Sequence, residues 1–170
     1  MKRKYGFFLF FLLALQMGIA GEVSCAQEIV SCIERNFSNS GVLSSSPNGF
    51  FYVKVDDGYV HQLNEFVHDM DFEKPPYFGE LYDSGAHISV IYPNEINGSI
   101  PEITELGESI LFQVTGCEIF QTPDWEGIEQ VYVVLVDSPA LDQLRKKYGF
   151  FEEPNFHITI GVKRTLKSAA

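Results

Sequence analysis

Hydrophobic and polar residues alternate most strictly in two short segments of the chain. One is His87-Ile88-Ser89-Val90 and the other is His157-Ile158-Thr159-Ile160. Successive side chains of a β-strand point to opposite faces, so the histidine and the hydroxyl residue of each segment are expected to project together while the aliphatic residues face the core. Each segment therefore offers one imidazole and one hydroxyl on one face of a predicted strand.

The same kinds of pattern predict the remaining elements. Alternating or β-branched runs predict strands over residues 50–55, 86–92, 110–120 and 129–136. Apolar residues at spacings of three, four and seven predict a helix over about residues 60–70. A second helix is predicted to begin at the capping residue Asp137 or Ser138 and to stop at Gly149, and the second histidine strand follows it.

The order of these elements indicates an α+β fold. A strand, a helix and a histidine strand are followed by two strands, a helix and the second histidine strand, so the chain divides into two similar halves. We therefore predict a bilobal, pseudo-symmetric domain of two antiparallel sheets with flanking helices. Strand and helix alternation also allows a parallel α/β sheet, but the sequence has no Gly-rich phosphate loop such as G-x-G-x-x-G to support it.

Residues 1–26 have the pattern of a signal peptide. Three basic residues at positions 2–4 precede an apolar run over residues 7–20, and small residues before Gln27 suit a cleavage site. The apolar run is shorter than the roughly 18 residues that a membrane-spanning helix needs. We therefore expect export, to the periplasm or the cell exterior, without a membrane anchor after processing.

The length of 170 residues suits one domain with its own core. Residues 27–49 are predicted as a linker or loop, because residues 36–49 are rich in Ser, Asn, Gly and Pro. Residues 50–170 are predicted as the packed domain. We expect this domain to be a monomer.

Acidic residues strongly outnumber basic ones in the expected mature chain. Residues 27–170 contain nine Lys and Arg against 22 Asp and Glu, a formal net charge of −13. Proteins that bind long RNA or DNA neutralise its phosphates with Lys and Arg, so we expect no long nucleic acid as a partner. A small nucleotide or short oligonucleotide suits the domain better, because a local site can hold one phosphate against an unfavourable overall field.

Removal of residues 1–26 leaves two cysteines, Cys32 and Cys117. In an oxidising compartment, two cysteines of an exported protein can form a disulfide. The sequence does not give their separation, so two separate thiols remain the alternative.

The two four-residue segments, 70 residues apart, resemble the paired H-x-S/T-x motifs of the two-histidine (2H) phosphoesterase superfamily. This superfamily includes 2′-5′ RNA ligase-like proteins and cyclic nucleotide phosphodiesterases. The resemblance covers about residues 50–163 and implies that the two motif strands lie side by side and line a central groove. It also implies catalytic acid and base roles for His87 and His157, in an order that the sequence does not decide, and phosphate binding by Ser89 and Thr159.

Two such pairs suit the hydrolysis of a cyclic phosphate, 2′,3′-cyclic or related. One imidazole takes a proton from water while the other gives a proton to the leaving ribose oxygen, and imidazole suits both tasks near neutral pH. The two hydroxyls can donate hydrogen bonds to the non-bridging phosphate oxygens. The resemblance thus implies a phosphodiesterase that acts on a small nucleotide or an oligonucleotide end and needs no metal or other cofactor.

Two further residues are candidates for substrate binding. Lys163 lies on the same strand face as His157 if the strand continues without interruption, and it can then help to hold phosphate; a solvated lysine is the alternative. Trp125, in a turn-rich loop, can stack on a nucleobase or simply cover a hydrophobic edge. Tyr92 and Phe156 adjoin the motifs but alternate to the other face, which favours core packing for both.

Two other functions remain open at the level of sequence. A secreted module that binds a nucleotide or a partner protein without catalysis would keep the fold and lose the reaction. A metallohydrolase is the second alternative, since His61, Glu65 and His68 have helical spacings of four and seven. The sequence lacks an H-E-x-x-H arrangement there, which argues against a metal site.

Overall fold

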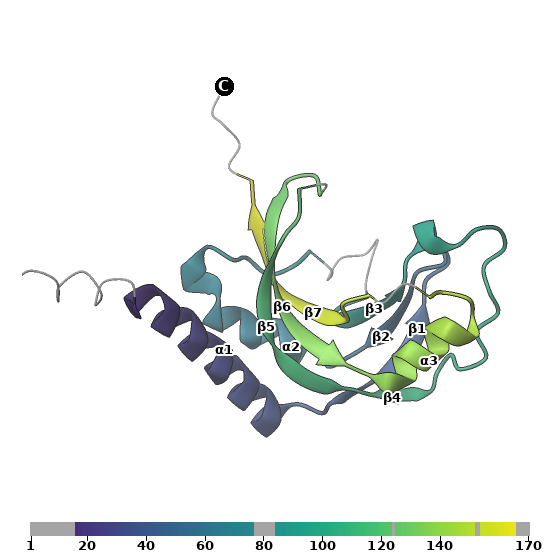
Figure 1. Cartoon of the computed structure of the whole chain (residues 1–170), viewed down its shortest axis with the longest axis horizontal. Coiled ribbons are helices and arrows are strands. Elements are labelled where there is room, and N and C mark those ends of the chain that lie inside the picture. The colour runs from purple at the N-terminus through teal and green to yellow at the C-terminus, as the bar shows by residue number, and fades with distance from the viewer. Residues whose placement is uncertain (1–15, 77–83, 124, 152–153, 166–170) are drawn as a thin grey trace, which may run out of the picture.

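The computed structural model describes residues 16–76, 84–123, 125–151 and 154–165, and it confirms the α+β fold class (Figure 1). The helices are α1 (Gln16–Asn36), α2 (Gly58–His61) and α3 (Pro139–Lys147), with short 3-10 helices η1 (Leu63–Phe66), η2 (His68–Met70) and η3 (Pro93–Glu95). The strands are β1 (Ser40–Ser45), β2 (Phe51–Lys54), β3 (His87–Ile91), β4 (Ser109–Leu111), β5 (Gln113–Gln121), β6 (Ile128–Asp137) and β7 (His157–Arg164). No helix among the described residues is long and apolar enough to cross a membrane.

The strands of the described residues form one antiparallel sheet in the order β4-β1-β2-β3-β7-β6-β5. The two histidine strands, β3 and β7, are neighbours at its centre, where Ile88 lies opposite Ile158. On either side of this pair, β2 pairs with β3 and β6 pairs with β7, as the predicted pseudo-symmetry requires. The two predicted antiparallel sheets are thus the two halves of one sheet, because the contact between β3 and β7 joins them.

The two edge strands of the sheet come from adjacent residues. The sequence predicted one strand over residues 110–120, but the buried residue Phe112 separates β4 from β5. β4 pairs with β1 while β5 pairs with β6, so one stretch of chain reaches both edges of the sheet. This connection requires a strongly curved sheet, and the bend of β5 and β6 is visible in Figure 1.

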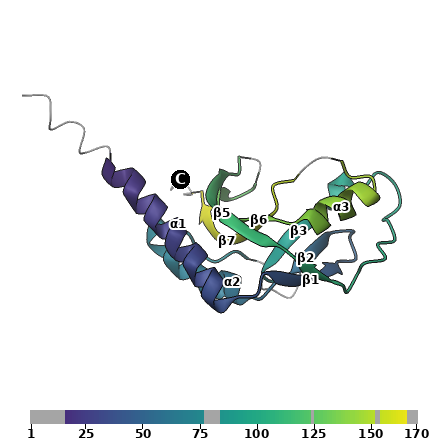
Figure 2. The ribbon, with the colours of Figure 1, turned by 60° about the horizontal axis from the view of Figure 1, so that its bottom comes forward.

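The N-terminal part of the domain differs from the prediction. Residues 27–49 are not a linker or loop, because α1 and β1 occupy most of them. Ile29 and Ile33, four residues apart on α1, are fully buried, and so is Leu43 of β1. Both elements were missed because their segments are largely polar. A surface helix needs only one apolar stripe to pack on a core, and a strand near the edge of a sheet needs only one buried side chain. Figure 2 shows α1 lying along one end of the domain beside α2.

The predicted signal peptide overlaps α1. Residues 1–15 lie outside the described residues, and residues 16–26 form the first half of the helix. The expected cleavage position before Gln27 therefore falls within α1, and the buried Ile29 and Ile33 lie on the domain side of it.

Three short helical turns, α2, η1 and η2, replace the single helix predicted over residues 60–70. The predicted apolar face is present, since Val60, Leu63 and Val67 are fully buried. Asp71, with a φ of 65°, follows η2 in the left-handed region and ends the run. α2 and η1 pack against β7 and help to close the core on the face of the sheet opposite the histidine motifs.

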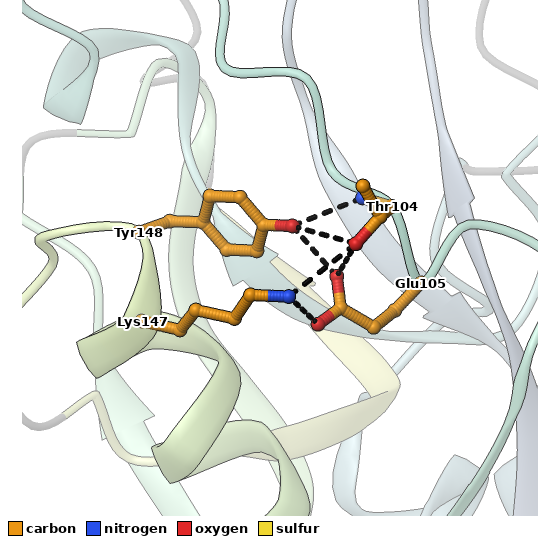
Figure 3. A network of polar contacts seen from close by, with 4 residues as sticks. All are labelled: Thr104, Glu105, Lys147 and Tyr148. Carbon is orange, nitrogen blue, oxygen red and sulfur yellow. Dashed lines mark hydrogen bonds and ion pairs between the residues drawn. The ribbon is translucent and has the colours of Figure 1, made fainter.

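The second predicted helix, α3, is present and is fastened to the rest of the domain at both ends. At its start, Ser138 occupies the capping position, but its hydroxyl donates to the carbonyl of Leu111 on β4 at 2.7 Å. At its end, Tyr148 donates to Glu105 at 2.7 Å and Lys147 pairs with the same carboxylate at 2.5 Å (Figure 3). The hydrogen bond from Lys147 is the main reason why the pKa of Glu105 falls to about 2.

Candidate active site

The two motifs meet at one pocket at the centre of the sheet. Ile88 and Ile158, the second residues of the motifs, are fully buried in the core. Because side chains alternate along a strand, the first and third residues of each motif point to the other face. That face forms a pocket of about 910 Å³, and its described lining includes His87, Ser89, His157 and Thr159. The structure therefore brings the four predicted motif residues together.

Each motif strand carries a one-residue bulge at the last position of its four-residue segment. The register between β2 and β3 shifts after Ser89, so that Val90 is the extra residue of β3. The register between β6 and β7 shifts after Thr159, so that Ile160 is the extra residue of β7. A bulge bends and twists its strand and reverses which face the following residues occupy. The two halves of the site thus share one local geometry at equivalent positions.

Both imidazoles are oriented by the same kind of hydrogen bond. Nδ1 of His87 lies 2.7 Å from the carbonyl oxygen of Gly85, and Nδ1 of His157 lies 2.6 Å from that of Asn155. A carbonyl oxygen can only accept, so Nδ1 carries a proton in each ring. In the neutral form the lone pair is therefore on Nε2, and Nε2 is the atom that exchanges protons.

The protein lowers the pKa of both histidines below the ordinary value of 6.5. Burial is the largest cause in each case, because it disfavours the charged ring, and the hydrogen bond to the carbonyl opposes it. The pKa of His87 is lowered further by the charge of His157 and by that of Lys54, which lies opposite His87 on β2. A charge on His157 therefore makes protonation of His87 less favourable.

The hydroxyls of Ser89 and Thr159 lie beside the imidazoles in the pocket lining. Within the described parts of the chain, neither hydroxyl has a hydrogen-bond partner. Thr159 is 7% exposed and lines the pocket. Two donors that lack a protein acceptor are suited to the oxygens of a bound anion.

Aromatic side chains form the pocket wall beside His87. Phe50 stacks on Tyr52 at a ring-centroid distance of 5.2 Å and on Tyr92 at 5.8 Å. His87 meets Phe50 and Tyr52 edge to face at 5.5 and 5.6 Å. These contacts hold the imidazole in place and leave an aromatic surface facing the pocket.

Sequence analysis missed Phe50 and Tyr52 as site residues. Residues 50–53 are all aromatic or aliphatic, so polarity did not show which face was the core. The period-two spacing from Phe50 to Tyr52 was the available signal, because it places both on the face opposite Phe51 and Val53, which are buried.

The bulges decide the placement of two other predicted residues. Tyr92 is 39% exposed and lines the pocket, so its predicted core position is wrong, because the bulge at Val90 reverses the alternation. Lys163 does not share a face with His157, because the bulge at Ile160 turns it to the opposite side. Its Nζ lies 3.9 Å from a carboxylate oxygen of Asp71, away from the pocket lining.

The remaining aromatic candidates lie close to where the sequence placed them. Trp125 lines the pocket and is 44% exposed, a position from which its indole can stack on a ligand. Phe156 is buried in the core, as predicted. A neighbouring aromatic, Phe120, meets the ring of His157 edge to face at 5.5 Å.

Cys32 and Cys117 are both thiols in the structure. Cys32 lies on α1 and Cys117 on β5, two elements that pack together, and both side chains are half-buried against the main core. The disulfide that the sequence left open is not formed.

The residues of the metal-site alternative do not gather. The predicted helix is broken into separate turns, so His61, Glu65 and His68 do not continue one helical face, and all three are exposed. Among the described residues, no group of three His, Cys, Asp or Glu side chains is close enough to hold a metal ion.

Comparison with known families agrees with this geometry. A family model described as "Swiss Army Knife, 2H phosphoesterase domain" matches residues 51–167, which include both histidine motifs. The chain therefore belongs to the 2H phosphoesterase family, and this membership gives it a phosphoesterase-type function. Neither a curated protein nor a solved structure matches the chain in the corresponding searches.

Proposed function

We propose that this chain is a phosphodiesterase that hydrolyses a cyclic phosphate, 2′,3′-cyclic or related, on a small nucleotide or an oligonucleotide end. The observation that carries the proposal is the convergence of two imidazoles and two hydroxyls on one pocket, with both rings oriented by the same hydrogen bond. These groups supply a base, an acid and two anion-binding donors, so the reaction requires no metal.

In the proposed reaction, the neutral imidazole accepts a proton from water at Nε2 as the water oxygen bonds to phosphorus. The protonated imidazole gives its Nε2 proton to the ribose oxygen as the bond from that oxygen to phosphorus breaks. Ser89 and Thr159 donate to the non-bridging oxygens, whose negative charge grows in the transition state. The products are a phosphomonoester and a free ribose hydroxyl, and the two histidines have exchanged protonation states.

We assign the base role to His87 and the acid role to His157. The two halves of the site differ in the residue opposite each histidine, which is Lys54 for His87 and Leu135 for His157. A cation beside His87 makes a proton there more costly, even with Lys54 paired to Asp57 at 2.8 Å. A substrate with a better leaving group should rescue the rate of His157→Ala but not of His87→Ala; rescue of His87→Ala alone would reverse the assignment.

A small substrate with a single phosphate suits the charges around the pocket. Among the described lining residues there is no Lys, Arg, Asp or Glu. One protonated imidazole can balance one phosphodiester charge, whereas a second phosphate would meet no cation in the lining and an unfavourable field from a strongly acidic chain. The aromatic wall and Trp125 offer stacking surfaces for a base.

We also propose that the protein works as a monomer after export. The basic start and the apolar run of residues 1–26 support export, and the buried Ile29 and Ile33 keep the rest of α1 with the domain after cleavage. Mass spectrometry of the exported protein should give a chain that begins at or near Gln27. A retained N-terminus would contradict this part of the proposal.

The reaction is tested with purified protein and 2′,3′-cyclic nucleotides in the presence of EDTA. We expect turnover in EDTA, and we expect His87→Ala and His157→Ala each to lower kcat/KM by about 10² to 10⁴-fold, the usual contribution of a general acid or base. His61→Ala, which alters an exposed histidine outside the pocket lining, is the matched control and should keep the wild-type rate. Full turnover in either motif variant, or loss of turnover in EDTA, would refute the mechanism.

A further inference from the structure

The two bulges of the motif strands are each held by a buried side chain from outside the sheet. Arg145 of α3 donates through Nη1 to the carbonyl of Val90, the extra residue of β3. Asn64 of η1 donates through Nδ2 to the carbonyl of Ile160, the extra residue of β7, at 3.0 Å. Arg145 is 2% exposed and Asn64 is 3% exposed, so water does not compete for either bond. We infer that Arg145 and Asn64 are positioning residues that hold the two histidine and hydroxyl pairs in their catalytic geometry.

A bulge needs such support because it interrupts the regular ladder of the strand. The carbonyl of the extra residue points away from the usual sheet partner, and a buried carbonyl without a donor destabilises the conformation. Satisfying that carbonyl from a helix fixes the local twist of the strand. The twist, in turn, determines where the hydroxyl just before the bulge and the histidine two residues earlier point.

On β3 the support extends to the pocket wall. Arg145 also forms an ion pair with Glu95 at 2.7 Å, and Glu95 accepts a hydrogen bond from the backbone N–H of Tyr92 at 2.7 Å. The same set of contacts therefore fixes the carbonyl of Val90 and the backbone of Tyr92. Loss of Arg145 should disturb the aromatic wall as well as the Ser89 hydroxyl.

On β7 the support includes close packing on the other side of the bulge. Asn64 reaches Ile160 from a segment that continues to Glu73, and Glu73 exchanges backbone hydrogen bonds with Val162 at 2.9 and 2.8 Å. Gly161 packs so tightly against Phe72 that an added Cβ would lie 2.8 Å from the Phe72 Cβ. The β7 bulge is therefore enclosed between a buried hydrogen bond and a backbone bridge.

The role can be tested with Asn64→Leu and Arg145→Met, which remove the donors and keep much of the side-chain volume. The controls are exposed neighbours on the same elements, Glu65→Leu and Lys146→Met. This arm rests on the proposed phosphodiesterase activity. We expect each buried-donor variant to lower kcat about ten- to a hundredfold with little change in KM, the usual result of a small misplacement of catalytic groups. We expect the controls to match the wild type.

A second measurement does not depend on activity. Nitrogen NMR of the full-length folded protein reports the tautomer and titration of each imidazole. Asn64→Leu should move the pKa of His157 toward 6.5 and leave His87 nearly unchanged, and Arg145→Met should do the reverse, because each donor supports its own strand.

The kinetic and NMR results together distinguish failure of the proposed function from failure of the positioning role. If the wild-type protein hydrolyses no cyclic phosphate, the proposed function fails, while motif-specific shifts of the imidazoles would still support the positioning role. If both variants fold and show wild-type kcat and unchanged imidazole titrations, the positioning role is overturned. Should Arg145→Met fail to fold, Arg145→Lys keeps one donor for the carbonyl of Val90, and the same NMR comparison applies.

Discussion

At the scale of single residues, the site is defined by two imidazoles that line one pocket and bind a backbone carbonyl through the same nitrogen, Nδ1. The carbonyls of Gly85 and Asn155 fix the proton on Nδ1, and burial makes the charged ring less favourable in both cases. The four motif residues could be predicted from sequence because alternation places them on one strand face. The carbonyls that orient the imidazoles could not be predicted, because every residue has a backbone carbonyl and the sequence does not show which one accepts the hydrogen bond.

The pH dependence of the reaction follows from the direction of these pKa shifts. The reactive form needs one protonated ring, and its pKa lies below 6.5, so the acid is lost as pH rises through a value lower than that of free imidazole. We expect a bell-shaped profile of kcat/KM with its maximum below pH 6.5 and a fall of about tenfold per pH unit on the alkaline side. Steady-state rates from about pH 4.5 to about pH 9 test this, and a plateau that extends above pH 8 would contradict it.

Thr159 should contribute to activity but hardly to stability. Its hydroxyl has no hydrogen-bond partner in the described chain, so Thr159→Val should lower kcat/KM by about 10²-fold and leave the free energy of unfolding nearly unchanged. Thr122 is equally buried but donates to the carbonyl of Ile128 at 3.0 Å. Thr122→Val should therefore cost about 1 to 2 kcal/mol in urea denaturation. Equal destabilisation by both substitutions would refute the argument.

At the scale of elements, the bulges explain why the sequence placed Tyr92 and Lys163 on the wrong faces of their strands. Hydrophobic alternation located β3 and β7 correctly, yet it assumed uninterrupted strands. One extra residue in each strand moved Tyr92 into the pocket wall and Lys163 out of reach of it. A bulge depends on hydrogen bonds with distant partners, such as Asn64 to Ile160, and these are not encoded in local periodicity.

Two strand glycines provide a matched test of the packing around the β7 bulge. An added Cβ at Gly161 would lie 2.8 Å from the Cβ of Phe72 and 3.1 Å from a methyl carbon of Val67, whereas at Gly116 of β5 it would meet nothing within 4 Å. Gly161→Ala should lower the free energy of unfolding by about 1 to 3 kcal/mol through overpacking. Gly116→Ala should leave it unchanged or raise it by about 0.5 kcal/mol. Chemical denaturation of both variants measures the two free energies of unfolding. Equal stability of the two variants would contradict the tight packing described at Gly161.

At the scale of the whole molecule, one curved sheet separates the core from the pocket. α1, α2 and η1 cover one face, and the two histidine motifs open on the other. The sequence predicted two similar halves, but it did not predict that β4 and β5 are edge strands connected through Phe112, because strand pairing partners lie far apart in the chain. The sequence also did not predict that α1 belongs to the domain. The N-terminal half of this helix falls in the signal-peptide pattern of residues 1–26, and its C-terminal half falls in residues 27–49, which were predicted as a linker or loop.

The strongly acidic chain and the pocket lining together predict selection by substrate charge. Adenosine 2′,3′-cyclic phosphate should be hydrolysed with a kcat/KM about tenfold higher than its 5′-phosphorylated form at low salt, and added salt should narrow the difference. The 5′-O-methyl derivative is the control for size, because it extends the ligand without charge. The prediction fails if the 5′-phosphorylated substrate reacts as fast as the parent, or if the neutral 5′-O-methyl derivative is equally slow.

The central claim is that His87 and His157 act together on one phosphodiester. It is tested most directly by kcat/KM for the wild type, His87→Ala, His157→Ala and the double variant, measured on one cyclic nucleotide in EDTA. We expect the double variant to be slower than the slower single variant by no more than about tenfold, because removing either member of a cooperating pair already disables the step. Fully multiplicative effects, or wild-type activity in either single variant, would contradict the account.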